Sequence, residues 1–191
     1  PIRCVFPSDK RSVIKPTLRF NVVYYFPSKV ELDTFVVPNE IFNEYENKLD
    51  LTFTELNNGI YKGYKSRINS KMSYDTDVKA AMYFERQPLI ISQGNVLSFQ
   101  FKNDNTENKI DFKSFNIELP DGMVLNCPYI KTQEFLDILN NQLNNEDRTS
   151  EKFECSVDIN QNVFGGSKAD ILKIYPPIIG KLEYESILKK E

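Results

Sequence analysis

Residues 109–145 read KIDFKSFNIELPDGMVLNCPYIKTQEFLDILNNQLNN and predict a strand, a turn and a helix in direct succession. Apolar and polar residues alternate in the first part, and the alternation slips by one residue at Ser114, as in a strand with one buried face and a bulge. Pro120-Asp121-Gly122 follows as a turn signal. Thr132 then has the side chain of a helix N-cap, and apolar residues recur after it at spacings of three and four. The sequence therefore predicts an amphipathic helix over 132–143.

Short segments of alternating polarity predict strands along most of the remaining chain. Strands are expected over 17–26, 34–37, 51–56, 60–66, 89–92, 96–102, 152–164 and 171–174. Residues 78–84 fit either a strand or a helical turn. Asn57-Asn58-Gly59 and Gln93-Gly94-Asn95 are placed as hairpin turns between neighbouring strands. Further helices are expected over 39–49, with Asn39 as the cap, and over the tail 181–191.

The succession of many short strands with few helices predicts the fold class. We expect a mainly β, jelly-roll or β-sandwich-like single domain over residues 1–191, with about two or three short helices. The alternative is an α+β sheet with its helices on one face. The sequence shows no internal repeat and no linker long enough to divide the chain.

Composition and charge narrow the classes of function. Hydrophobic residues make up 40% of the chain and aromatic residues 13%, as in a globular β-rich protein. The formal net charge is −3 and the cationic residues are spread along the chain, unlike those of a duplex-binding protein. No stretch reaches the length of a membrane helix, and PIRCVFPSDKRS at the start lacks the apolar part of a signal peptide. We therefore expect neither a membrane span nor nucleic acid as the main partner.

The chain contains no histidine. It therefore cannot form a Ser-His or Cys-His nucleophile pair, a facial triad or most catalytic zinc sites from its own residues. We expect a non-enzymatic protein without cofactor or catalytic residues. A histidine-free enzyme that uses carboxylates and Mg²⁺, around Asp75, Asp77 and Asp111, stays open as an alternative.

Two oxygen-rich segments have simpler explanations than metal binding. NDNTENKID, residues 103–111, resembles a calcium loop but lacks its central Gly and its terminal Glu, so a solvated loop explains it better. Asp75 and Asp77 fit a local cap equally well. We therefore expect no metal site.

Three cysteines, at positions 4, 127 and 155, are too few and too scattered to indicate a disulfide framework. They are interpreted as small buried hydrophobic residues in a reducing compartment.

One segment combines basic and aromatic residues, as phosphate-binding and base-stacking surfaces do. This 61–71 cluster consists of Tyr61, Lys62, Tyr64, Lys65, Arg67 and Lys71. The alternative hypothesis is therefore a soluble binding module for phosphate-bearing or nucleic-acid ligands. A strand edge protected from pairing by lysines would produce the same pattern.

The strand FNIELPDG followed by the helix TQEFLDILNNQL resembles a segment of penton-base and minor-capsid proteins of virophages, Polinton-like elements and related large DNA viruses. The residues that carry the resemblance are Phe115, Ile117, Leu119, Pro120, Gly122, Phe135, Leu136, Leu139 and Asn140. It covers about a fifth of the chain.

The resemblance implies a virion structural protein built on a jelly roll, without a catalytic site, located in the virion or the host cytoplasm. Its partners would be other capsid or structural chains, in a homo- or hetero-oligomer, with the termini as further contact segments. An insertion between strand and helix, over 120–131, is where a partner would bind. The predicted contact residues are Pro120, Gly122, Tyr129, Phe135 and Leu139.

Overall fold

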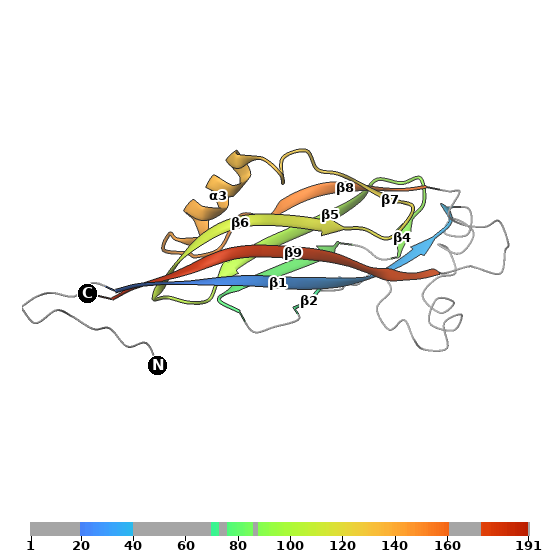
Figure 1. Cartoon of the computed structure of the whole chain (residues 1–191). Coiled ribbons are helices and arrows are strands. Elements are labelled where there is room, and N and C mark those ends of the chain that lie inside the picture. The colour runs from blue at the N-terminus through green and yellow to red at the C-terminus, as the bar shows by residue number, and fades with distance from the viewer. Residues whose placement is uncertain (1–19, 40–69, 73–75, 86–87, 161–172, 191) are drawn as a thin grey trace, which may run out of the picture.

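A computed structural model describes residues 20–39, 70–72, 76–85, 88–160 and 173–190. Two β-sheets pack face to face, and one helix lies over one end of them (Figure 1). The first sheet contains β2 (Lys71–Met72), β1 (Phe20–Val37), β9 (Lys173–Lys190) and β6 (Asn108–Glu118) in that order, with β4 (Leu89–Ile90) also on β1. The second contains β3 (Val78–Phe84), β5 (Asn95–Asn103), β8 (Phe153–Ile159) and β7 (Met123–Asn126). The mainly β, sandwich-like fold is confirmed.

Aromatic rings fill the space between the sheets. Phe99 of β5 lies at the centre of this cluster, with its ring centroid 5.2 Å from that of Phe115 and 5.6 Å from that of Phe153. Phe101 and Phe115 meet edge to face at 4.9 Å. Such contacts add to the burial of apolar surface, which explains why a chain rich in Phe and Tyr forms two packed sheets.

Gly180 allows β9 to pack closely against the opposite sheet. A Cβ atom at this position would lie 2.6 Å from Val30 Cγ1 and 3.0 Å from Met82 Sδ. Since real Cβ atoms do not approach other atoms so closely, a larger residue would displace core side chains.

The local predictions over 109–145 are confirmed. The ladder between β6 and β9 shifts register between Phe112 and Ser114, where the bulge was expected. The Met123 N–H donates to the carbonyl of Pro120 at 3.1 Å, and Gly122 has a φ of 84°, as the third position of a type II turn requires. Helix α3 (Gln133–Leu143) follows, with Thr132 as its N-cap.

Two predictions about the long strands are wrong. β1 is one strand that continues through Pro27, where two strands were expected. β9 continues through Pro176 and Pro177 to Lys190, where a strand end and a terminal helix were expected. In the tail, Leu182, Tyr184 and Ser186 are buried while the residues between them face outward, and this period of two fits a strand. A register shift between Leu32 and Thr34 lies opposite the two prolines, as is common where proline enters a sheet.

The predicted hairpin between 89–92 and 96–102 is also wrong. β4 pairs in parallel with β1, through Val36 and Val37, and so belongs to the other sheet. β5 instead pairs antiparallel with β3, which settles residues 78–84 as a strand. The Asn95 side chain bonds to the N–H and the carbonyl of Ile90 at 3.1 Å each and holds this connection.

Two or three helices were expected. Among the described residues, α3 is the one complete helix, and Asn39 is a single helical residue at the end of a described range. Apart from Asn39, the predicted helix over 39–49 lies outside the described residues, as does the predicted hairpin over 51–66. In the part of the chain that the structure describes, no helix is long and apolar enough for a membrane span.

Candidate functional site

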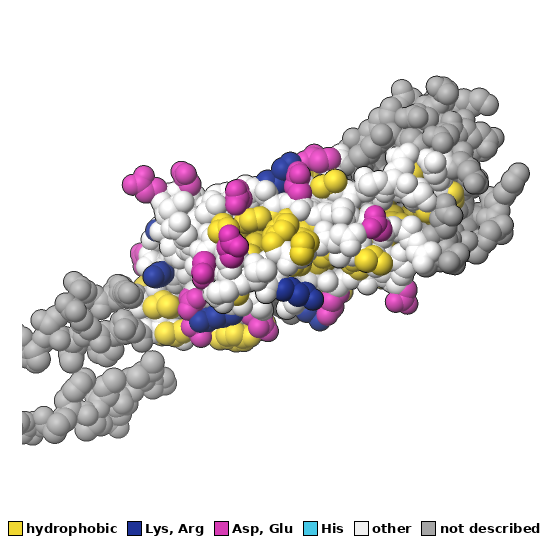
Figure 2. All heavy atoms as spheres, turned by 90° about the horizontal axis from the view of Figure 1, so that it is seen from above, with side chains coloured by type: hydrophobic (Ala, Val, Ile, Leu, Met, Phe, Trp, Pro, Cys, Tyr) yellow, Lys and Arg dark blue, Asp and Glu magenta, His cyan; other side chains and the backbone are white. Residues whose placement is uncertain are grey.

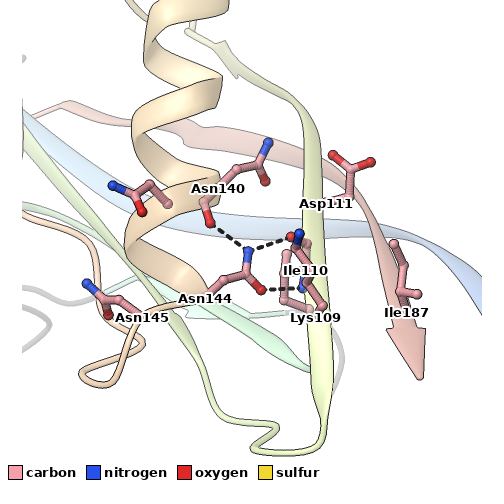
Figure 3. A pocket seen from close by; sticks show the side chains of 8 residues that line it. Lys109, Ile110, Asp111, Asn140, Asn144, Asn145 and Ile187 are labelled. Atoms are coloured by element: carbon pink, nitrogen blue, oxygen red, sulfur yellow. Dashed lines mark hydrogen bonds between the residues drawn. The ribbon is translucent and has the colours of Figure 1, made fainter. Parts of the chain in front are cut away.

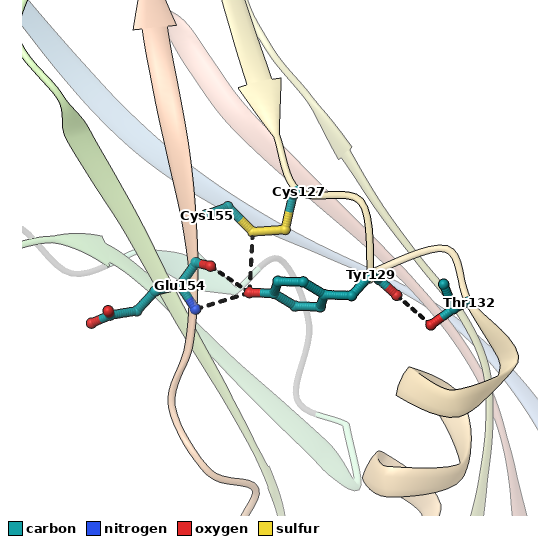
Figure 4. Close-up of a disulfide and its surroundings, with 5 residues drawn as sticks. All are labelled: Cys127, Tyr129, Thr132, Glu154 and Cys155. Atoms are coloured by element: carbon teal, nitrogen blue, oxygen red, sulfur yellow. Dashed lines mark hydrogen bonds between the residues drawn. A yellow bond between two sulfur atoms is a disulfide. The ribbon is translucent and has the colours of Figure 1, made fainter.

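The junction over 120–131 is held by local contacts. Pro120 is buried and Gly122 forms the turn. Tyr129 donates its hydroxyl hydrogen to the Glu154 carbonyl and accepts the Glu154 N–H at 3.1 Å (Figure 4). Its partial burial raises the pKa of Tyr129, and the nearby Glu154 and Glu151 charges add to this, although the main-chain hydrogen bond acts in the opposite direction. The two hydrogen bonds of the Tyr129 hydroxyl anchor the junction to β8.

Cys127 and Cys155 form a disulfide beside Tyr129 (Figure 4), so their interpretation as unpaired hydrophobic residues is wrong. Their Cα atoms are 5.0 Å apart. β7 pairs with β8 up to Asn126 and Ser156, and the two cysteines occupy the next positions of that ladder. The sequence could not indicate this, because the two cysteines are 28 positions apart in the chain. The expectation of a reducing compartment rested partly on these cysteines and loses that support.

Two further residues of the predicted contact set lie in the core. Phe135 and Leu139 have exposed fractions of 2% and 0%. They are the buried face of α3, and their spacing of four explains the apolar pattern. A partner could reach them only if the core opened, so a contact on α3 would have to use its outer face.

The 61–71 cluster lies almost entirely outside the described residues. Lys71 is described only as part of β2, where its backbone pairs with Glu31 of β1. The phosphate-binding role stays a prediction.

The carboxylates proposed for Mg²⁺ do not converge. Asp77 and Asp111 lie against opposite faces of the first sheet, because Asp77 bonds to the inward Ser186 while Asp111 pairs in register with Glu185. Asp75 lies outside the described residues. Among the described residues, no group of three or more acidic or cysteine side chains comes together as metal ligands would.

The Asp77 carboxylate instead holds a polar network. It accepts hydrogen bonds from Asn105 at 3.0 Å, from Asn108 at 3.1 Å and from the Ser186 hydroxyl at 2.6 Å. Partial burial pushes the pKa of Asp77 up, but the bonds from Ser186, Asn105 and Asn108 together outweigh it and leave this pKa below its ordinary value. The calcium-like segment 103–111 thus comprises the end of β5, a short connection and the start of β6, and its Asn105 and Asn108 are bonded to Asp77, just before β3, and Asn108 also to Ser186 of β9.

The two edges of the first sheet differ in how their backbone groups are covered. The edge of β6 is covered by α3, through Asn140 and Asn144 (Figure 3). Asn140 Oδ1 accepts the Phe112 N–H at 2.6 Å, and its Nδ2 donates to the Phe112 carbonyl at 3.3 Å. Asn144 does the same for Ile110, at 2.8 and 2.7 Å. Each amide takes the place of a peptide group in a neighbouring strand, so this part of β6 is closed to further pairing.

A polar groove of about 490 Å³ runs along this contact between α3 and β6. Its lining consists of Lys109, Ile110, Asp111, Asn140, Asn141, Asn144, Asn145 and Ile187 (Figure 3). The side-chain amides of Asn140 and Asn144 are already bonded to the β6 backbone. We therefore interpret the groove as a consequence of the packing of α3 on the edge of β6.

The opposite edge, on β1, is only partly covered by the described strands. β2 pairs with β1 only at Val30 and Glu31, and β4 only at Val36 and Val37. Among the described residues, no strand pairs with 20–28 on the side away from β9. β1 and β9 run side by side along the whole sheet (Figure 1), so this open segment is fixed in position by its pairing with β9.

The ladder shows which β1 residues point away from β9. The N–H groups of Ile110 and Phe112 face α3, so Asp111 between them bonds to its β9 partner, Glu185. Glu185 therefore points toward β6, and its other neighbour, Tyr25, must direct its N–H and carbonyl away from β9. Val23 and Pro27, two residues to either side, have the same orientation, and Pro27 has no N–H to offer there.

Three consecutive side chains of this segment are large, hydrophobic and exposed. Val23 is 53% exposed, Tyr24 49% and Tyr25 56%. The whole segment 20–28, FNVVYYFPS, carries no charged residue. Open edges normally carry lysine or other charges that prevent pairing, and this one lacks them. By contrast, Figure 2 shows a face on which acidic, basic and hydrophobic side chains are interspersed.

The strand over 17–26 was predicted, but its role as an open edge was not. Pro27 together with the uncharged run before it is the signal for an edge strand that the sequence contains. Which side of β1 is free depends on the pairing with β9, more than 150 residues later, and local patterns do not carry that information.

Comparisons with known proteins add no identification: no protein-family model, no curated protein and no solved structure matches this chain.

Proposed function

We propose that this chain is a non-enzymatic structural protein of a virion, a capsid, penton or minor-capsid component that acts through assembly contacts with other chains. The observation that carries the proposal is the open, uncharged edge of β1 with its exposed Val23, Tyr24 and Tyr25. An edge of this kind favours pairing with another chain, and monomeric proteins usually block it.

The path of the chain through the two sheets also supports the proposal. β1 pairs with β9 and β5 pairs with β8, while β6 adds to β9 and β7 adds to β8. The chain crosses between the sheets from β5 to β6, from β6 to β7 and from β8 to β9. We interpret this path as a jelly roll in which α3 and its loops replace one hairpin and β2, β3 and β4 are additions, and jelly rolls are frequent in capsid proteins.

The fold alone does not specify a function, because lectins and cupins use the same winding. Among these classes, the resemblance of 115–140 to penton-base and minor-capsid proteins favours a virion component. Within the described residues, nothing favours the phosphate-binding module or the Mg²⁺-dependent enzyme over it.

Incorporation into particles tests the proposal. Particles purified from the source of the chain should contain it in a fixed ratio to the other structural proteins. After dissociation, purified chain added back should enter reassembled particles, whereas the Tyr25→Lys variant should enter much less. Val96→Lys is the matched control, since Val96 is 43% exposed on the central strand β5. Absence of the chain from particles would overturn the proposal.

A further inference from the structure

We propose that the open edge of β1 pairs with the same edge of a second copy of this chain, antiparallel and about a twofold axis at Tyr24. This inference rests on the proposed function and names the partner for its contact surface. It joins the first sheets of two copies into one continuous sheet with the two β1 strands at its centre.

Val23 and Tyr25 set the register. Both are exposed, their N–H and carbonyl groups point away from β9, and Tyr24 lies midway between them. In an antiparallel pair centred on Tyr24, Val23 of one copy lies opposite Tyr25 of the other. Both residues direct their N–H and carbonyl away from β9, so they exchange both main-chain hydrogen bonds. Pro27 faces the same way without an N–H and ends the paired stretch.

The absence of charged residues on this edge favours a second copy of the chain as its partner. The residue on a twofold axis meets its own copy, and its immediate neighbours meet residues two positions away from their own, so charges of one sign there would face each other. The segment 20–28 contains none. Two copies of this edge can therefore pair without repulsion between like charges.

The side chains also fit such a contact. Val23 and Tyr25 lie on the outer face of the sheet, where they form β-branched–aromatic pairs across the axis, a favourable combination in antiparallel strands. On the inner face, the Tyr24 ring lies 6.2 Å from that of Phe26, which stacks on the buried Tyr184 at 5.5 Å. Two copies of Tyr24 at the axis therefore link the aromatic clusters of the two chains.

A charge-exchange experiment tests the register directly. Full-length wild type should self-associate in sedimentation velocity. Tyr24→Lys and Tyr24→Glu should each raise the dissociation constant roughly tenfold, because like charges meet at the axis and the aromatic pair is lost. An equimolar mixture of the two variants should associate again, since Lys then faces Glu.

The control pair is Val96→Lys and Val96→Glu, which should leave association unchanged alone and mixed. Val23→Pro provides a second test. It removes an N–H that points away from β9, so circular dichroism should stay that of a folded chain while association weakens.

The outcomes separate the inference from the proposed function. A wild type that stays monomeric at every concentration, or a Tyr24 mixture no better than its components, overturns self-pairing at Tyr24. If that chain still enters particles, the structural function stands with a different partner. If the chain self-associates as described but is absent from particles, the proposed function fails and the pairing stands.

Discussion

Thr34 shows how a single buried hydroxyl can lower stability. It is fully buried on β1, and among the described residues its Oγ1 has no hydrogen-bond partner. Thr34→Val replaces that hydroxyl with a methyl group and should raise the free energy of unfolding by about 1 kcal/mol. Urea denaturation at neutral pH measures this change.

Thr132 gives the opposite result for the same substitution. Its Oγ1 accepts the Phe135 N–H at 3.2 Å and caps α3. Thr132→Val should therefore lower the free energy of unfolding by about 1 kcal/mol. Equal effects of the two substitutions would contradict the assignment of one hydroxyl as unbonded and the other as a cap.

Asp77 contributes stability that depends on pH. Its pKa in the folded chain lies below the ordinary value of 3.8, because bonds from Ser186, Asn105 and Asn108 outweigh its burial. A lowered folded-state pKa means that the contribution is complete above the unfolded pKa and is lost as the pH falls through the folded one. Asp77→Asn should cost about 1–2 kcal/mol at pH 7 and progressively less in acid. Denaturation curves of both proteins from pH 7 to pH 2 should converge, and parallel curves would contradict this role.

At the scale of elements, α3 protects the edge of β6. Asn140→Asp keeps the size of the side chain and the acceptor for the Phe112 N–H but loses the donor to the Phe112 carbonyl. We expect a loss of about 1–3 kcal/mol and faster hydrogen exchange at Phe112. Asn141→Asp is the matched control, because Asn141 is exposed on the same helix and the charge change is the same. Equal losses in both variants would show that charge, and not edge cover, is responsible.

The elements that the sequence predicted are those with local causes. The cap at Thr132, the turn at Gly122 and the bulge before Ser114 depend on neighbours within a few residues, and the structure has all three. β4 was misplaced because its partner is the distant β1. The sequence predicted that β1 and β9 would end at their prolines. Edge positions and bulges accept proline, because they need no N–H in the ladder.

At the scale of the whole molecule, the disulfide joins the end of β7 to β8 around α3. Removing it by the double substitution Cys127→Ser and Cys155→Ser should lower the free energy of unfolding by about 3 kcal/mol, because the unfolded chain loses a closed loop. Thermal denaturation with and without dithiothreitol measures this. The reductant should shift the wild type and leave the double variant unchanged, and an equal shift in both would contradict a structural disulfide.

The two edges of the first sheet differ in whether another strand can pair with them. Side-chain amides from α3 cover β6 at Ile110 and Phe112, whereas the 20–28 edge of β1 is uncharged, exposes aromatic residues and has no partner strand among the described residues. The candidate contact over 120–131 came from a local resemblance, whereas the β1 edge emerges only when residues 20–28 and 182–190 pair.

Amide hydrogen exchange at Val23 and Tyr25 tests most directly whether β1 is the assembly edge. Both N–H groups point away from β9, so they should exchange rapidly in dilute, monomeric chain and slowly in assembled material. The Tyr24 N–H, which bonds to β9, should be protected in both states and serves as the internal reference. Rapid exchange at Val23 and Tyr25 in assembled material, with new protection elsewhere, would contradict the account.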